Sequence, residues 1–164
     1  MKVSKIQQLL SIQDAHDKQY HADIYYQTTL FKLKHFALHY SKYLSRLILD
    51  EVDKDQLMVD TLLITLSFAN TLSCPMYDVN LETGLEDNFP EKTIIARYAR
   101  CVEILTKALD SVDHIERSDP RSALDMIPNL MLETLQVYIN TFEKKDFESL
   151  VLKRYQTIRD KRLS

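Results

Sequence analysis

The sequence predicts an all-α protein, a bundle of about five to six helices. The chain of 164 residues has one glycine, Gly84, against four prolines. Hairpins, tight sheet turns and phosphate-cradling loops use glycine for its positive-φ conformations, so this composition favours helices joined by short polar connections. Apolar residues recur with the helical period in about six segments, and no segment shows the alternation that is typical of a strand.

Length and composition predict a single domain over residues 1–164. Hydrophobic residues make up 45% and charged residues 27% of the chain, which is ordinary for a globular protein. The formal net charge of −3 leaves no broad cationic surface, so nucleic acid is not an expected partner. Cys74 and Cys101 form no CxxC pair and are expected to be free, largely buried thiols in a reducing compartment.

Two stretches of the chain bear on localisation. The first residues, MKVSKIQQLLSIQD, lack the long apolar run of a signal peptide. The most apolar stretch, LMVDTLLITLSFANTL, is too short to span a bilayer and is interrupted by Asp60. We therefore expect a cytoplasmic protein with no membrane partner.

Three helices are predicted in the N-terminal half, over residues 4–20, 28–49 and 55–72. The acidic connection DEVDKD precedes the third helix, where Asp53 or Asp55 can cap its start and favour its positive end. Because this connection is short, the second and third helices are expected to form an antiparallel hairpin.

The C-terminal half is predicted to begin with a long loop over residues 74–92, either a lid or binding element or a solvated connection. A fourth helix is expected over residues 91–111. A fifth is expected to run through Leu130, Leu135, Tyr138, Ile139 and Phe142, with Pro128 acceptable only in its first turn. The last helix is expected over residues 146–162, and its basic end, KRYQTIRDKR, is expected to be solvated and to fray.

The second helix contains KLKHFALHYSKYLSRL, which carries two stripes at about 100° per residue. The apolar stripe consists of Leu33, Phe36, Ala37, Tyr40, Leu44, Leu47 and Ile48. On the opposite side, His35, His39, Lys42 and Arg46 form a basic row. The basic row is either the solvent-exposed side of a surface helix, or it lines a groove or dimer interface, where its side chains bind phosphate or relay protons.

The third helix is apolar around almost its whole circumference, which predicts a buried helix. Asp60, Ser67 and Thr71 form one narrow polar seam on it. A buried carboxylate is costly unless a cation, a metal or hydrogen-bond donors meet it. Asp60 is therefore expected either to pair with a lysine or histidine, with Lys42 as the permanent cation nearby, or to bind a divalent metal ion. The apolar circumference also predicts self-association.

The order of these features resembles the MazG-like all-α nucleoside triphosphate pyrophosphohydrolases. The matching pieces are HYSK (residues 39–42), DEVDKD, LMVD (residues 57–60) and FANTL (residues 68–72), and the resemblance covers about residues 5–72. It implies a helical bundle, usually dimeric or higher. It also implies binding of a magnesium-bound nucleotide and release of pyrophosphate through an activated water.

The resemblance carries over to few of the family's metal ligands. Asp60 is the one motif carboxylate preserved, so it is the expected metal ligand, and Asn70 stands at a polar position that the family uses near the nucleotide. His39 and Lys42 stand where the first motif has glutamates, and Leu57 stands where the second motif has one. Because magnesium prefers oxygen ligands, the family's multi-magnesium site cannot be built from these positions.

Three outcomes stay open for the chemistry. One metal ion is held by Asp60 with another acid such as Glu51 or Asp55; or His35 and His39 hold a softer metal or act as acid and base. In the third outcome the basic row binds phosphate directly, without hydrolysis.

The function predicted from the sequence is a divergent nucleotide pyrophosphohydrolase, or a protein that binds a phosphorylated small molecule, with Mg²⁺ or Mn²⁺ as its cofactor. The candidate catalytic residues are His35, His39, Lys42 and Asp60, and the candidate substrate-binding residues are Lys42, Arg46 and Asn70. The alternative is a non-catalytic helical interaction module that kept the fold.

Overall fold

The computed structural model describes residues 5–50, 53–76, 91–113, 120–142 and 146–163, and these residues form helices and no strand. The helices are α1 (Lys5–Tyr20), α2 (Ala22–Tyr25), α3 (Thr29–Leu49), α4 (Lys54–Leu72), α5 (Glu91–Asp113), α6 (Pro120–Thr141) and α7 (Phe147–Leu163). The all-α prediction is confirmed. The short α2 was not predicted, and most of the predicted loop at residues 74–92 lies outside the described residues.

Side-chain caps begin two of the helices that carry the sequence motifs. The Thr28 hydroxyl accepts a hydrogen bond from the backbone N–H of Phe31 at the start of α3. The Asp53 carboxylate accepts from the backbone N–H groups of Asp55 and Gln56 at the start of α4. These caps satisfy donors that a helix start leaves without a partner, and the expected Asp53 cap is confirmed.

Helix α6 begins at Pro120, two turns before Pro128. Pro128 is therefore inside the helix, and the prediction that it lies in the first turn is wrong. Proline in a helix interior removes one backbone hydrogen bond. Buried apolar residues on both sides of Pro128, including Leu124 and Leu132, pack into the core and hold the helix through this position.

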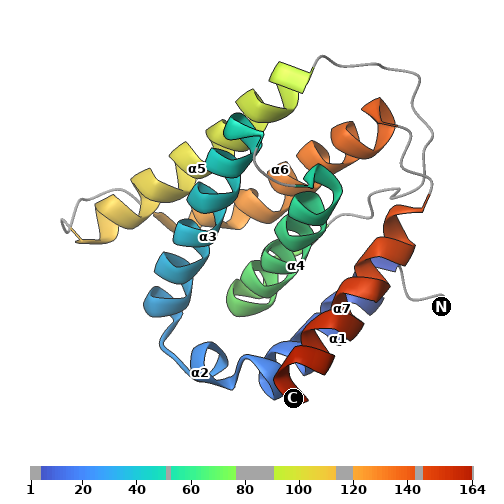
Figure 1. Cartoon of the computed structure of the whole chain (residues 1–164). Helices are drawn as coiled ribbons and strands as arrows, with labels where there is room; N and C mark the ends of the chain where they lie inside the picture. The colour runs from blue at the N-terminus through green and yellow to red at the C-terminus, as the bar shows by residue number, and fades with distance from the viewer. Residues whose placement is uncertain (1–4, 51–52, 77–90, 114–119, 143–145, 164) are drawn as a thin grey trace.

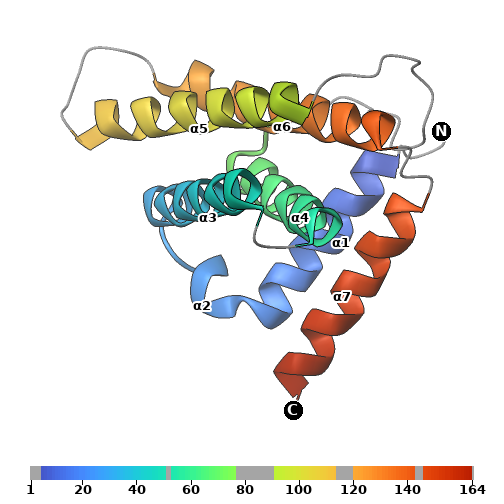
Figure 2. The same ribbon diagram turned by 45° about the horizontal axis from the view of Figure 1, so that its top comes forward.

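Helix α4 lies at the centre of the fold. It packs against α1, α3, α6 and α7, and α3 and α4 run antiparallel as predicted (Figure 1). Helices α5 and α6 form a layer across α3 and α4, and α1 and α7 lie side by side on the other side of α4 (Figure 2). The apolar residues predicted to surround the third helix are all buried: Leu57, Met58, Val59, Leu62, Leu63, Leu66, Phe68, Ala69 and Leu72.

This packing accounts for the apolar surface of α4 within one chain. The ground on which the sequence predicted self-association is therefore removed, and the oligomeric state stays a prediction of the resemblance. Within the described ranges, none of the helices has a stretch long and apolar enough to cross a membrane. Cys74 and Cys101 are buried free thiols, as expected.

The buried stripe of α3 differs from its prediction at one end. Leu33, Phe36, Ala37, Tyr40 and Leu47 are buried, but Ile48 is 57% exposed and Tyr43 is buried in its place. Because Tyr43 lies on the side of α3 towards His39, the buried arc is rotated towards the basic row. This rotation leaves His35 and His39 half-buried, while Lys42 and Arg46 stay exposed.

Candidate functional site

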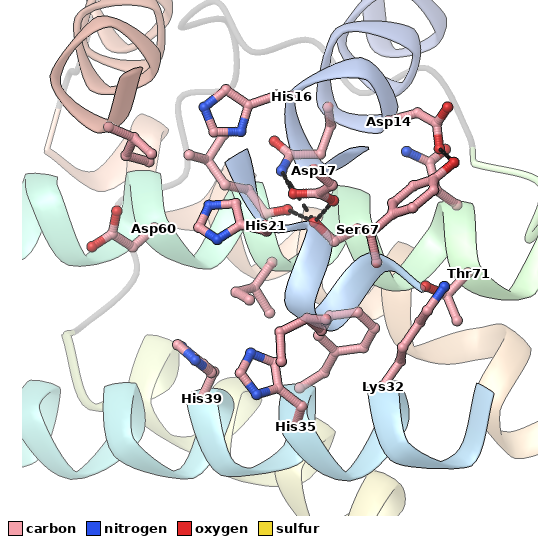
Figure 3. Close-up of a pocket in the computed structure, with 18 of the residues that line it drawn as sticks. Asp14, His16, Asp17, His21, Lys32, His35, His39, Asp60, Ser67 and Thr71 are labelled. Carbon is pink, nitrogen blue, oxygen red and sulfur yellow. Dashed lines mark hydrogen bonds between the residues drawn. The ribbon is translucent and has the colours of Figure 1, made fainter. Parts of the chain in front are cut away.

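A cavity of about 540 Å³ lies among α1, α2, α3, α4 and α7. We call it the pocket. Its volume is in the range of sites that bind small molecules. Four of the five histidines of the chain line it, namely His16, His21, His35 and His39 (Figure 3). Four aspartates line it as well: Asp14, Asp17, Asp23 and Asp60.

The polar seam of α4 opens onto this pocket. Asp60, Ser67 and Thr71 all line it, and Asn70 does so beside them. The Asn70 side-chain amide also donates to the backbone carbonyl of Leu10, 2.9 Å away, which ties α4 to α1. The narrow polar strip of an otherwise buried helix is thus the wall of a cavity.

Asp60 is met by an arginine from α7. Nε of Arg154 donates to Oδ1 of Asp60 at 2.7 Å, and Nη2 donates to Oδ2 at 3.1 Å. The side chains are 24% and 18% exposed, so the pair is largely removed from solvent. The expected ion pair exists, but the expected partner is wrong. Arg154 lies in the segment that was predicted to be a solvated basic tail.

The ion pair bears on the predicted metal role of Asp60. Both carboxylate oxygens accept hydrogen bonds from Arg154, and Oδ1 accepts another from Gln56. A metal ion at Asp60 would have to displace or share this guanidinium. Two other acids were expected to share a metal ion with Asp60. Asp55 is not among the residues that line the pocket, and Glu51 lies outside the described residues.

The basic row of α3 divides into two parts. His35 and His39 line the pocket, with ring centroids 4.6 Å apart. Lys42 and Arg46 are exposed and are not among the lining residues, although the Lys42 ammonium is 3.4 Å from Nδ1 of His39. The lysine of α3 that lines the pocket is Lys32, one turn before His35.

Burial keeps the two α3 histidines neutral. It lowers the pKa of His39 to about 4, and the nearby Lys42 charge lowers it further in the same direction. Burial also lowers the pKa of His35. Nδ1 of His39 is 3.1 Å from the hydroxyl of Tyr43, the residue that the rotated stripe buries. At neutral pH these imidazoles therefore act as uncharged donors and acceptors.

His16, Asp17 and His21 form a second group, which sequence reasoning missed and which we call the histidine–aspartate cluster. One ligand-type atom from each residue lies within 4.8 Å of the other two. Asp17 accepts hydrogen bonds from the Gln13 amide at 2.7 Å and the Ser67 hydroxyl at 2.5 Å. The sequence segment HDKQYH holds all three residues of the cluster. Its two histidines are five residues apart, a spacing that does not bring side chains together on one face of a continuous helix. They lie close together here because α1 ends at Tyr20, just before His21.

His16 is buried and Asp17 is half-buried, and burial shifts the pKa of both side chains. Burial raises the pKa of Asp17 to about 6, although its hydrogen bonds from Ser67 and Gln13 oppose the shift. Burial lowers the pKa of His16 to about 4. The His16 side chain is 7% exposed, and neither of its ring nitrogens has a hydrogen-bond partner among the described residues.

The residues at the family's magnesium positions do not fit that ion. Leu57 is buried and offers no oxygen, Lys42 is a cation, and the Asp60 carboxylate is paired with Arg154. No protein-family model, no curated protein and no solved structure matches this chain.

Proposed function

We propose that this chain binds a nucleotide, or another phosphorylated small molecule of similar size, in the pocket and hydrolyses a phosphoanhydride bond of that ligand. In this proposal it is a divergent MazG-like pyrophosphohydrolase. The observation that carries the proposal is the convergence of the two motif-bearing helices on one cavity. His39 from the first motif, and Asp60 and Asn70 from the second motif and its extension, all line the pocket.

The charge of the pocket limits how a phosphorylated ligand can bind. Among the described lining residues, four aspartates stand against Lys32 and Arg154, and Arg154 is already paired with Asp60. Phosphate oxygens would be repelled by such a wall unless a cation entered with them. The proposal therefore requires the ligand to bind as a complex with a divalent cation.

The chain's own side chains supply recognition and proton handling. Lys32 offers a point charge to a phosphate, while Thr71 and Asn70 offer hydrogen bonds along α4. The neutral imidazoles of His35 and His39 can accept a proton from an attacking water. With a pKa of about 4, His39 is a weak base at neutral pH, so its contribution depends on the ligand complex changing its surroundings.

The test is release of pyrophosphate from a panel of canonical and modified nucleoside triphosphates, with Mg²⁺, Mn²⁺ and Zn²⁺ in turn. The wild-type chain is expected to release pyrophosphate from at least one of them, and His39→Gln is expected to reduce the rate at least tenfold. Glu103→Gln, an exposed change on α5 outside the pocket, is the control. A rate for His39→Gln equal to that of the wild type would contradict the role given to this residue.

A second candidate function is binding without hydrolysis. The loss of oxygen ligands at Lys42 and Leu57, together with the pairing of Asp60 to Arg154, favours it. Isothermal titration separates the two candidates, because saturable binding without pyrophosphate release supports the second. A chain that neither binds nor cleaves any member of the panel would contradict both.

A further inference from the structure

We propose that His16, Asp17 and His21 bind one divalent first-row transition-metal ion, of the Zn²⁺, Co²⁺ and Mn²⁺ class, with open coordination positions towards the pocket. Two imidazoles and one carboxylate are the donor set of many catalytic sites for such ions. Only the role of the bound ion in the pocket rests on the proposed function. Metal binding itself needs no nucleotide.

The distances within the cluster are close to those of a coordinated ion. Two ligand atoms that are each about 2.1 Å from one ion lie at most about 4.2 Å apart. The ligand atoms of His16, Asp17 and His21 lie within 4.8 Å of one another, so small side-chain rotations bring all three to coordination distance. The three side chains reach one end of the pocket from α1 and the turn that follows it (Figure 3).

His16 supplies an observation independent of this geometry. It is only 7% exposed, yet both of its ring nitrogens lack a hydrogen-bond partner among the described residues. A buried polar group without a partner is costly, and native structures contain few of them. Coordination of an ion would give one of these nitrogens a partner.

Neighbouring side chains hold the proposed ligands in place. The Gln13 amide donates to Oδ1 of Asp17, and its oxygen accepts from the hydroxyl of Tyr155 at 2.7 Å. The Tyr155 ring also packs edge-on against His16, with centroids 5.0 Å apart. Ser67 donates to the other oxygen of Asp17. Outer hydrogen bonds of this kind orient ligands and raise metal affinity, and each carboxylate oxygen keeps a lone pair for the ion.

The proposed site differs from the one implied by the resemblance in place and in chemistry. It lies on α1 and the residue after it, whereas the family motifs correspond to α3 and α4. Two nitrogen ligands favour a transition metal over magnesium. The cation that a phosphorylated ligand requires in this pocket would then be held by the chain before the ligand arrives.

The test titrates the full chain, stripped with a chelator, with Co²⁺ and with Zn²⁺ in the absence of any nucleotide. Calorimetry is expected to give one ion per chain, and bound Co²⁺ is expected to show the visible absorption of a nitrogen- and oxygen-ligated ion. His21→Asn and Asp17→Asn are each expected to weaken binding at least tenfold. Position 21 is the N-cap of α2, where the histidine side chain makes no capping hydrogen bond and asparagine is a favoured residue, so this variant is expected to fold.

Asp14→Asn is the matched control, since Asp14 lies on the same helix and lines the same pocket outside the cluster. It is expected to leave the affinity within about twofold of the wild type. Circular dichroism confirms that each variant keeps its helices. The proposal is overturned if the wild type binds no ion, or if affinity survives in His21→Asn and Asp17→Asn but is lost in His35→Gln. Pyrophosphate release without metal binding at this cluster would sink this inference and leave the proposed function standing.

Discussion

Arg154 and Lys42 show how much the identity of one partner matters for Asp60. The Arg154 guanidinium makes two hydrogen bonds to the carboxylate, whereas Lys42 lies beside His39 and is exposed. A paired carboxylate that loses its cation keeps the cost of its burial. The consequence of a substitution therefore differs sharply between these two cations.

We predict that Arg154→Ala lowers the free energy of unfolding by about 1–3 kcal/mol, between the values for surface and fully buried pairs. Lys42→Ala is expected to stay within about 0.5 kcal/mol, the range of ordinary surface changes. The double variant Asp60→Asn/Arg154→Ala should lose less than the sum of the single variants. Urea midpoints are measured for these three variants and for Asp60→Asn alone. Equal small shifts for Arg154→Ala and Lys42→Ala would contradict the assignment of the ion pair.

The lowered pKa of His39 makes the free energy of unfolding depend on pH. Its pKa falls from 6.5 to about 4 in the folded chain, so between these values the unfolded chain binds a proton that the folded chain does not. The contribution is fully present above pH 6.5 and is lost as the pH falls towards 4.

We expect His39→Gln to flatten the fall in stability between pH 6.5 and pH 4 by about 1–2 kcal/mol, since partial solvent screening reduces the full effect. The free energy of unfolding is measured by urea at several pH values in the presence of a chelator. Identical pH profiles for the wild type and His39→Gln would show that burial does not lower the pKa of this histidine.

At the scale of elements, helical periodicity predicted most of the fold. The periods and caps around residues 28–49 and 55–72 gave two helices to within one residue at each end. Pro128 misled the prediction of α6, because tertiary packing outweighs the local cost of proline. The four-residue α2 is too short for a period to be recognised.

The pocket could be predicted only in part, for a physical reason. The polar seam and His35 and His39 follow from helical geometry, and they do line the cavity. The contributions of α1, α2 and α7 depend on which helices pack together, which periodicity does not encode. Arg154 lies 94 residues from Asp60, and in sequence it belongs to an ordinary basic helix end.

Two residues of α7 are expected to differ clearly in how much they contribute to the free energy of unfolding. Phe147 is fully buried where α7 begins, while Leu152 is 49% exposed. We expect Phe147→Ala to cost about 3–5 kcal/mol, since it removes a large buried side chain and leaves a cavity.

Leu152→Ala is the matched control and is expected to stay near the surface range of about 0.5 kcal/mol. Hydrogen exchange of the α7 amides should accelerate in Phe147→Ala and stay unchanged in Leu152→Ala. Equal exchange in both variants would contradict the docking of α7 through its first turn.

At the scale of the whole molecule, the fold gathers residues from five helices around one cavity. α4 supplies the rigid central wall, α3 contributes two histidines, and α1 contributes the carboxylate of the proposed metal site. α2 and α7 close the cavity. In the proposed function this pocket, rather than another surface, binds the ligand.

The imidazole resonances of the chain report on binding in the pocket, because four of the five histidines line it. The measurement is a heteronuclear NMR titration of the Zn²⁺-loaded chain with each nucleoside triphosphate of the panel. We expect one of these nucleotides to shift the resonances of His16, His21, His35 and His39 together, with a common saturation. Saturable binding of a nucleotide that leaves all four resonances unmoved would contradict it.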